Sequence, residues 1–276
     1  MMQVCLNGSR GAADGARVPM SPGAMADSAA DAVLAGATDV HVHPKSPCGQ
    51  DTLSPRAVSA TLTEIRSRVS VPVGVTTGAW AEPDPVLRLE HVRGWTVLPD
   101  HASVNWHEPG AEELAALLIE LGVGVEAGVW SGTDGAARFA ASALAPRVLR
   151  VLAEVTDTDP DTAEDTAHTL LADLGGSPHG RPVLLHGEDG GTWPVLRLAG
   201  RLGLATRIGL EDTLSLPTGE RAVSNAELVR AGLAQTRPFQ GRGELRDQPP
   251  PDPQTKTHTP GGAHSSNKIH SSTPFP

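Results

Sequence analysis

Asp39-Val40-His41-Val42-His43-Pro44 decides the fold, because polar and apolar side chains alternate along it with the period of a β-strand. The alternation places the two valines on one face of that strand and the two histidines on the other. A stretch of helical period follows at 55–68, so the segment is the strand and the helix of one β/α unit.

Eight such units follow one another along the chain. Runs rich in Val, Leu and Ile predict strands at 3–7, 39–43, 71–76, 102–106, 124–129, 148–155, 183–186 and 206–210. Helical periodicity predicts helices at 21–35, 55–68, 84–92, 111–121, 134–144, 160–174, 193–202 and 225–234, three of which begin at Ser21-Pro22, Ser54-Pro55 and Asp159-Pro160. Eight units predict an α/β fold, a closed (β/α)8 TIM barrel. An open doubly wound sheet is the alternative, although no Gly-x-Gly-x-x-Gly turn favours it.

The composition excludes several classes of protein. With 39% apolar residues among 276, the chain is too apolar for a disordered protein, yet no run approaches the roughly 20 apolar residues of a membrane-spanning helix. The first residues do not form a secretory signal, which indicates a soluble, cytoplasmic protein. The net charge of −10 argues against a nucleic-acid partner. Because there are only two cysteines, Cys5 and Cys48, any metal would need histidine or carboxylate ligands.

The composition changes near residue 237. Residues 237–276 contain the proline-rich stretch Gln248-Pro249-Pro250-Pro251-Asp252-Pro253, and their few apolar side chains follow no period. Such a segment cannot bury a core. We therefore predict a barrel domain over 1–236 and a disordered tail over 237–276.

His41 and His43 end the second predicted strand, at the C-terminal mouth of the barrel, where catalytic side chains converge. Residues two apart on one strand face lie roughly 6 to 7 Å apart, which allows two imidazoles to bind one Zn²⁺ at about 2.0–2.1 Å each. The alternative is a pair of hydrogen-bonded histidines without a metal, but two buried imidazoles then need other polar partners. The spacing therefore favours half of a metal site.

Glu211 and Asp212 end the last predicted strand, four and five residues after Arg207. Adjacent residues at a strand end point in different directions, so one carboxylate can be a third metal ligand while the other accepts a proton. The arginine would keep a carboxylate oriented and ionised. Alternatively, the pair caps a turn and the arginine makes a surface ion pair.

Other predicted strand ends carry polar side chains: Thr77 and Gly78 after the third, Ser103 and Asn105 on the fourth, and Glu126 on the fifth. The glutamate stands among valines, where an idle carboxylate is rare. It is expected either to pair with an arginine or to contact a substrate.

The order of these motifs resembles that of the beta-keto acid cleavage enzymes. His-x-His-Pro at 41–44, Thr-Thr-Gly at 76–78, Ser-x-Asn at 103–105, Glu126, and the eighth-strand motif at 207–212 each fall at the expected strand end, over residues 3 to about 235. The resemblance implies a transferase: a beta-keto acid and acetyl-CoA give acetoacetate and a new acyl-CoA. It also suggests a homo-oligomer.

The resemblance further implies a role for each matching residue. His41, His43 and Glu211 would bind a divalent metal, with Zn²⁺ expected, and Asp212, oriented by Arg207, would remove the proton next to the ketone. Thr77, Gly78, Ser103, Asn105 and Glu126 would contact the substrate. The chemistry agrees, because a metal at a ketone oxygen stabilises an enolate, and because the base must not itself be a metal ligand.

One position departs from the family member that acts on 3-keto-5-aminohexanoate. That enzyme has a glutamate suited to the substrate's amino group after its first strand, whereas this chain has Asn7-Gly8-Ser9-Arg10. A cation in place of an anion predicts a substrate with a neutral or acidic far end, with Arg10 as the discriminating contact.

Two other functions remain open. An amidohydrolase-type hydrolase also begins with His-x-His on a barrel strand and would use His186 and Asp212, but a second later histidine is missing. A non-catalytic barrel that retains the metal site is the other alternative. Hydrolysis without CoA would favour the first, and a tightly bound zinc without acetyl-CoA consumption would favour the second.

Overall fold

Strands and helices alternate along the chain in a computed structural model that describes residues 1–14, 17–176 and 179–236. The strands are β1 Met2–Cys5, β2 Asp39–Val42, β3 Val73–Thr76, β4 His101–Asn105, β5 Gly124–Trp130, β6 Arg150–Val155, β7 Val183–Gly187 and β8 Thr206–Ile208. The helices are α1 Pro22–Leu34, α2 Pro55–Arg66, α3 Pro85–Arg93, α4 Ala111–Glu120, α5 Gly135–Ala141, α6 Ala163–Gly175, α7 Thr192–Leu202 and α8 Asn225–Thr236. The tail predicted at 237–276 lies outside the described residues.

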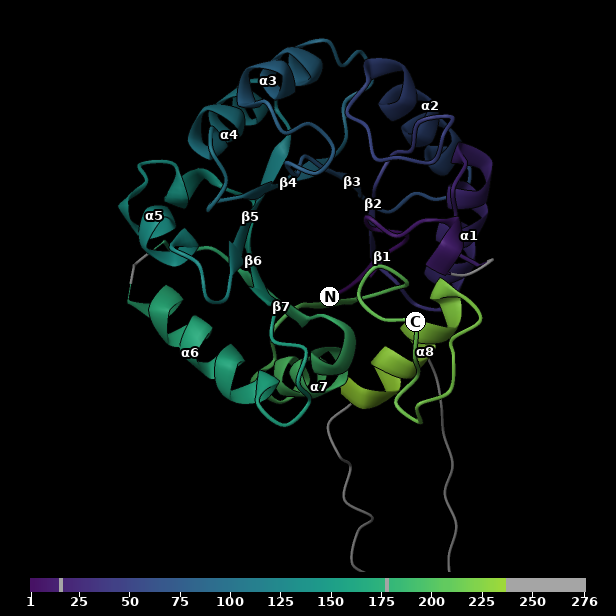
Figure 1. Ribbon diagram of the computed structural model, residues 1–276, viewed down its shortest axis with the longest axis vertical. Coiled ribbons are helices and arrows are strands. Elements are labelled where there is room, and N and C mark those ends of the chain that lie inside the picture. Colours follow the sequence, from purple (N-terminus) through teal and green to yellow (C-terminus); the bar gives the residue numbers. More distant parts are fainter. Residues whose placement is uncertain (15–16, 177–178, 237–276) are drawn as a thin grey trace, which may run out of the picture. The chain divides into compact units, whose positions relative to one another are not determined.

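The strands form one parallel sheet in the order β7-β6-β5-β4-β3-β2-β1-β8. The two ends of this sheet meet, because Leu184 in β7 bridges Ala205, next to β8. Figure 1 shows the result, a ring of strands with the helices around it. The predicted (β/α)8 barrel is confirmed, and the open doubly wound alternative is wrong.

Helix starts follow from local capping. Ser21 accepts a hydrogen bond from the backbone of α1, and Asp84 does the same for α3, each ahead of a proline in the first turn. The predicted start of the sixth helix at Asp159-Pro160 is wrong, since α6 begins at Ala163. The reason lies in Asp157, whose carboxylate accepts hydrogen bonds from Thr162 and Thr166 and ties the preceding turn to the helix.

The strands bury apolar side chains against the helices and polar side chains inside the barrel. Val40 and Val42 belong to the apolar core, whereas the residues between and before them are buried and polar. Five interior side chains form a hydrogen-bonded ionic layer: Gln3, Asp39, His101, Glu126 and Arg150. Gly74 leaves room for this layer, because a Cβ there would lie 2.0 Å from the His101 ring.

Among the described residues, no helix is long and apolar enough to cross a membrane.

Candidate metal centre and active site

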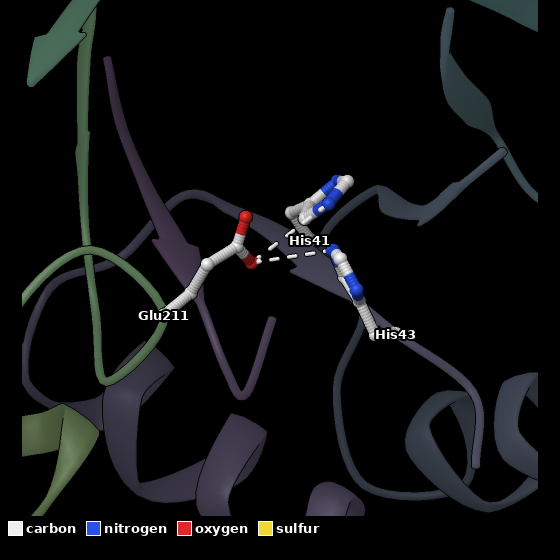
Figure 2. Close-up of side chains that lie close together, drawn as sticks. All are labelled: His41, His43 and Glu211. Carbon is white, nitrogen blue, oxygen red and sulfur yellow. Dashed lines mark ion pairs between the residues drawn. The ribbon is translucent and has the colours of Figure 1, made fainter. Parts of the chain in front are cut away.

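His41 and His43 lie beside Glu211 at the C-terminal end of the strand ring (Figure 2). The Oε2 atom of Glu211 is 3.9 Å from Nε2 of His41 and 3.6 Å from Nε2 of His43. Both rings are almost fully buried, and their centroids are 5.3 Å apart. One ligand atom from each of the three residues lies within 4.8 Å of the others. The structure therefore brings together the three side chains that the sequence assigns to a metal.

In each histidine, the ring nitrogen that points away from Glu211, Nδ1, faces a second carboxylate. Nδ1 of His43 is 3.1 Å from Oδ2 of Asp51, and the other oxygen of Asp51 accepts a hydrogen bond from Lys45. Nδ1 of His41 is 3.9 Å from Oε2 of Glu126. In addition, Asn7 accepts a hydrogen bond from the backbone N–H of His43 and donates one to its carbonyl. These contacts leave both Nε2 atoms directed at Glu211.

The two histidines have opposite pKa shifts. Burial lowers the pKa of His41 to about 4. Burial also opposes the charged form of His43, but the carboxylates of Glu211 and Asp51 outweigh it and raise the pKa to about 9. When no metal is bound, His43 therefore carries the proton and the positive charge that Glu211 and Asp51 stabilise. A metal ion would displace that proton.

The cluster fits a small divalent metal ion. Ligand atoms around a tetrahedral Zn²⁺ lie roughly 3.3 to 3.5 Å apart, slightly closer than those seen here. Among the described residues the buried Oε2 of Glu211 makes no hydrogen bond, as expected of an oxygen that binds a metal. Two imidazoles and one carboxylate also leave coordination positions open, as catalytic sites do. His41, His43 and Glu211 could therefore hold the ion.

Arg207, on β8, links the two carboxylates of the predicted pair. It donates to Oε1 of Glu211 at 2.9 Å and to Oδ1 of Asp212 at 3.1 Å. The second oxygen of Asp212 is buried and makes no hydrogen bond within the part of the chain that the structure describes. Asp212 therefore keeps one lone-pair oxygen free for a proton, while the arginine fixes the orientation of the group.

A cavity of about 170 Å³ opens over these residues, and we call it the mouth cavity. It is lined by Ser9, His43, Trp80, Trp130, Glu154, Glu188, Arg207, Glu211 and Asp212. Two of the three predicted ligands, His43 and Glu211, and the predicted base Asp212 thus share one cavity with two tryptophans and two further glutamates.

The predicted substrate contacts just after β3 and on β4 do not line this cavity. The hydroxyl of Thr77 donates to the carbonyl of Ser103 at 2.5 Å, and Asn105 donates to Glu108 at 2.9 Å. A Cβ on Gly78 would lie 2.3 Å from the Trp80 ring, so this glycine lets the tryptophan pack closely. These residues hold strand ends and the aromatic wall in place.

Glu126 and Arg10 have partners of their own. Glu126 is fully buried in the ionic layer and accepts hydrogen bonds from Arg150 at 2.7 Å and from Gln3 at 3.0 Å. The sequence left a pairing with arginine open, and the structure has one. Arg10 lies at the mouth, where it donates to the backbone carbonyl of Glu211 and pairs with Asp189 at 2.7 Å.

The sequence reasoning missed Glu154 and Glu188, and it assigned no position to Trp80 or Trp130. One signal was available for Glu154: it ends β6, and like Glu126 it is a carboxylate among apolar neighbours. His186 was considered only for the hydrolase alternative. It is buried between Arg207, which donates to its Nδ1 at 3.2 Å, and Glu154. It is not one of the three residues of the cluster.

Fold and site together define a class: a (β/α)8 barrel whose ionisable side chains gather at the C-terminal ends of its strands. The chain belongs to the beta-keto acid cleavage enzyme family, whose model matches residues 1–241. The resemblance that the sequence motifs indicated is confirmed. No curated protein matches the chain significantly.

Solved structures show the same fold at low identity. A structure described as the ternary complex of ObcA with a C4-CoA adduct and oxalate has a TM-score of 0.65 and 15% identity, and the match covers 79% of this chain and 63% of that one. The N-terminal domain of a putative aldolase from Bacteroides vulgatus has a TM-score of 0.52 and 14% identity, with 81% and 75% covered. This chain thus spans less than two thirds of the ObcA chain.

Proposed function

We propose that this protein transfers the acyl group of a beta-keto acid to coenzyme A in a metal-dependent reaction. The keto acid R–CO–CH₂–COO⁻ and acetyl-CoA would give R–CO–S-CoA and acetoacetate, so that the two acyl groups exchange partners. The expected metal is Zn²⁺ and the acetyl donor is acetyl-CoA, as the family resemblance implies. The same resemblance favours a homo-oligomer.

The observation that carries the proposal is the free, buried oxygen of Asp212 in the same cavity as Glu211 and His43. His41, His43 and Glu211 would hold the metal, which when bound supplies positive charge at the ketone oxygen of the substrate. Asp212 would remove a proton from the carbon next to that ketone. Arg207 fixes the direction of the carboxylate, because its guanidinium bridges both acidic residues.

The hydrolase alternative, of the amidohydrolase type, needs further histidine ligands from later strands. His186 instead accepts a hydrogen bond from Arg207 at Nδ1, and its Nε2 lies 3.6 Å from Glu154. We therefore place the hydrolase second.

Acetoacetate release tests the proposal. The zinc-loaded protein is incubated with acetyl-CoA and a panel of beta-keto acids that differ in the charge of their far end. We expect acetoacetate to form in amounts equal to the new acyl-CoA, and EDTA and Asp212→Asn each to abolish it. Activity that survives both treatments would contradict the mechanism, and hydrolysis without CoA would support the hydrolase. One bound zinc per chain with no acetyl-CoA consumption would support a non-catalytic barrel.

A further inference from the structure

Residues 44–52 form a short hairpin directly after β2, the strand that carries both histidines of the metal centre. Lys45 and Asp51 pair across this hairpin as an antiparallel bridge. Gly49 allows the tight turn between them, because its backbone is in the left-handed region at φ +83°. The hairpin therefore holds a lysine and an aspartate opposite each other, directly after His43.

Asp51 lies between two donors and uses a different oxygen for each. Its Oδ1 accepts a hydrogen bond from Nζ of Lys45 at 2.6 Å, and its Oδ2 lies 3.1 Å from Nδ1 of His43. The ion pair is buried, with 1% of the lysine side chain and 6% of the aspartate side chain exposed. An ionised carboxylate only accepts hydrogen bonds, so Nδ1 of His43 carries a proton in this contact. The Nε2 atom of the neutral ring then presents its lone pair toward Glu211, 3.6 Å away.

Lys45 also connects the hairpin to the loop after β1. Its ammonium group donates to the backbone carbonyls of Gly8 at 2.7 Å and Arg10 at 3.1 Å, so its three N–H bonds all have acceptors. Gly8 packs against the third predicted metal ligand, because a Cβ there would lie 2.5 Å from Cγ of Glu211. One buried lysine thus supports both sides of the metal centre, the histidine side through Asp51 and the opposite side through Gly8.

We propose that Lys45 and Asp51 are positioning residues of the metal centre, which together fix His43 in the tautomer whose Nε2 can bind the metal. This inference deepens the proposed function and rests on the metal centre in it. A histidine ligand must present a lone pair, and its other nitrogen commonly donates to a carboxylate. The lysine adds a constraint of its own. Because an ammonium group can only donate, it requires an acceptor on the side of Asp51 that faces it.

The lysine determines the effect of Asp51→Asn. The new amide must turn its oxygen toward Lys45, because an NH₂ group there would place two donors against each other. Its NH₂ group then faces Nδ1 of His43 and donates to it, so the proton of the neutral ring moves to Nε2, where it blocks the metal. Lys45→Met removes this constraint, and the amide can rotate so that its oxygen accepts from Nδ1 again.

A double-mutant cycle on zinc affinity tests this role without turnover. Zinc affinity is measured by competition with a chromogenic chelator for the full chain as wild type, Asp51→Asn, Lys45→Met and the double variant. We expect Asp51→Asn to weaken zinc binding about 10- to 100-fold. Lys45→Met should raise zinc affinity about tenfold more in the Asp51→Asn protein than in wild type. Asp27→Asn is the charge-matched control, because Asp27 is an exposed residue of α1 paired with Arg68, and it should leave zinc affinity unchanged.

Asp51→Ala is a second variant, which removes the side chain without placing a donor at Nδ1 of His43. It should therefore bind zinc about tenfold more tightly than Asp51→Asn. A merely structural role predicts the reverse order, because alanine loses more contacts than asparagine. That reverse order, an unchanged affinity in Asp51→Asn, or equal effects of Lys45→Met in the two backgrounds would overturn the proposal.

Turnover separates this role from the proposed function. Acetoacetate release is measured in parallel on the same proteins. The expected zinc affinities without any acetoacetate from the zinc-loaded wild type would refute the proposed function and leave the positioning role intact. Acetoacetate formation with equal effects of Lys45→Met in the two backgrounds would refute the positioning role alone.

Discussion

At the scale of single residues, His41 lies between two carboxylates: Glu211 at its Nε2 and Glu126 at its Nδ1. Nδ1 of His41 is buried and makes no hydrogen bond among the described residues, and it faces Oε2 of Glu126 at 3.9 Å. The same oxygen lies 3.0 Å from Nδ1 of His101 in the ionic layer. Metal-bound histidines commonly donate their second N–H to such a carboxylate, which fixes the ring and raises its basicity. Glu126 therefore has a position from which it can support a metal ligand.

Glu126→Gln is expected to lower zinc affinity roughly 10-fold, because the neutral amide supports the imidazole less well than a carboxylate does. Competition with a chromogenic chelator measures this affinity. Asp39→Asn is the matched control, since Asp39 accepts hydrogen bonds from the same Arg150 but is not placed against His41. It should weaken the fold and leave zinc affinity unchanged. Equal zinc affinities for wild type and Glu126→Gln would show that Glu126 serves the ionic layer alone.

Asp212→Asn separates chemistry from metal binding. The amide can still accept the Arg207 hydrogen bond, but it cannot take up a proton, so kcat should fall by about 10² to 10⁴. Zinc affinity should not change, because Asp212 lies outside the three-residue cluster. A variant that loses zinc together with activity would indicate that Asp212 is a ligand and would reverse the roles of the two acidic residues.

The sequence predicted the site residues that can be recognised from their place at the end of a single strand. It did not predict those whose place in the site depends on how neighbouring strands pair. His41 and His43 follow from alternation within one strand. Glu154 belongs to the cavity only because β6 lies beside β7 with Glu154 in register with His186. Such a relation between strands cannot be read from either segment alone.

At the scale of elements, periodicity was sufficient for the order and type of every predicted strand and helix in the described residues. The predicted ends of helices were less accurate where a side chain forms hydrogen bonds that hold the first residues in a turn instead of the helix. The Asp157 turn ahead of α6 is the clearest case, because its hydrogen bonds to Thr162 and Thr166 delay the helix past the proline that marked its predicted start.

Gly209 shows how closely β1 approaches the end of β8. A Cβ at this position would lie 1.9 Å from the backbone oxygen of Cys5, and backbone cannot move aside as a side chain can. Gly209→Ala should therefore lower the free energy of unfolding by at least about 1–3 kcal/mol, measured by urea denaturation. Gly23→Ala in α1 is the control, because nothing lies within 4 Å of the added Cβ. It should leave stability unchanged or raise it. Equal stability of wild type and Gly209→Ala would show that the strands can separate at no cost.

At the scale of the whole barrel, the interior is held by charge as well as by packing. Burial lowers the pKa of His101, but the carboxylates of Glu126 and Asp39 in the ionic layer outweigh burial and raise this pKa to about 10. Higher in the ring, burial and the nearby carboxylates Glu188 and Glu211 raise the pKa of Glu154 to about 8 against the opposing charge of Arg207. Both groups hold a proton in the folded protein at a pH where the unfolded chain has lost it. The interior therefore makes folding depend on pH.

The sign of this dependence can be tested with Glu154→Gln in the metal-free protein. A raised pKa stabilises the fold fully below the unfolded pKa, here about 4.5, and the contribution is lost as pH rises through about 8. Between these values wild type should lose about 1.4 kcal/mol of unfolding free energy per pH unit from this carboxyl, relative to the glutamine variant, which carries no proton to lose. Urea denaturation of both proteins at pH 5, 6, 7 and 8 measures the difference. Parallel curves would mean that Glu154 is ionised in the folded barrel across this range and would contradict the raised pKa.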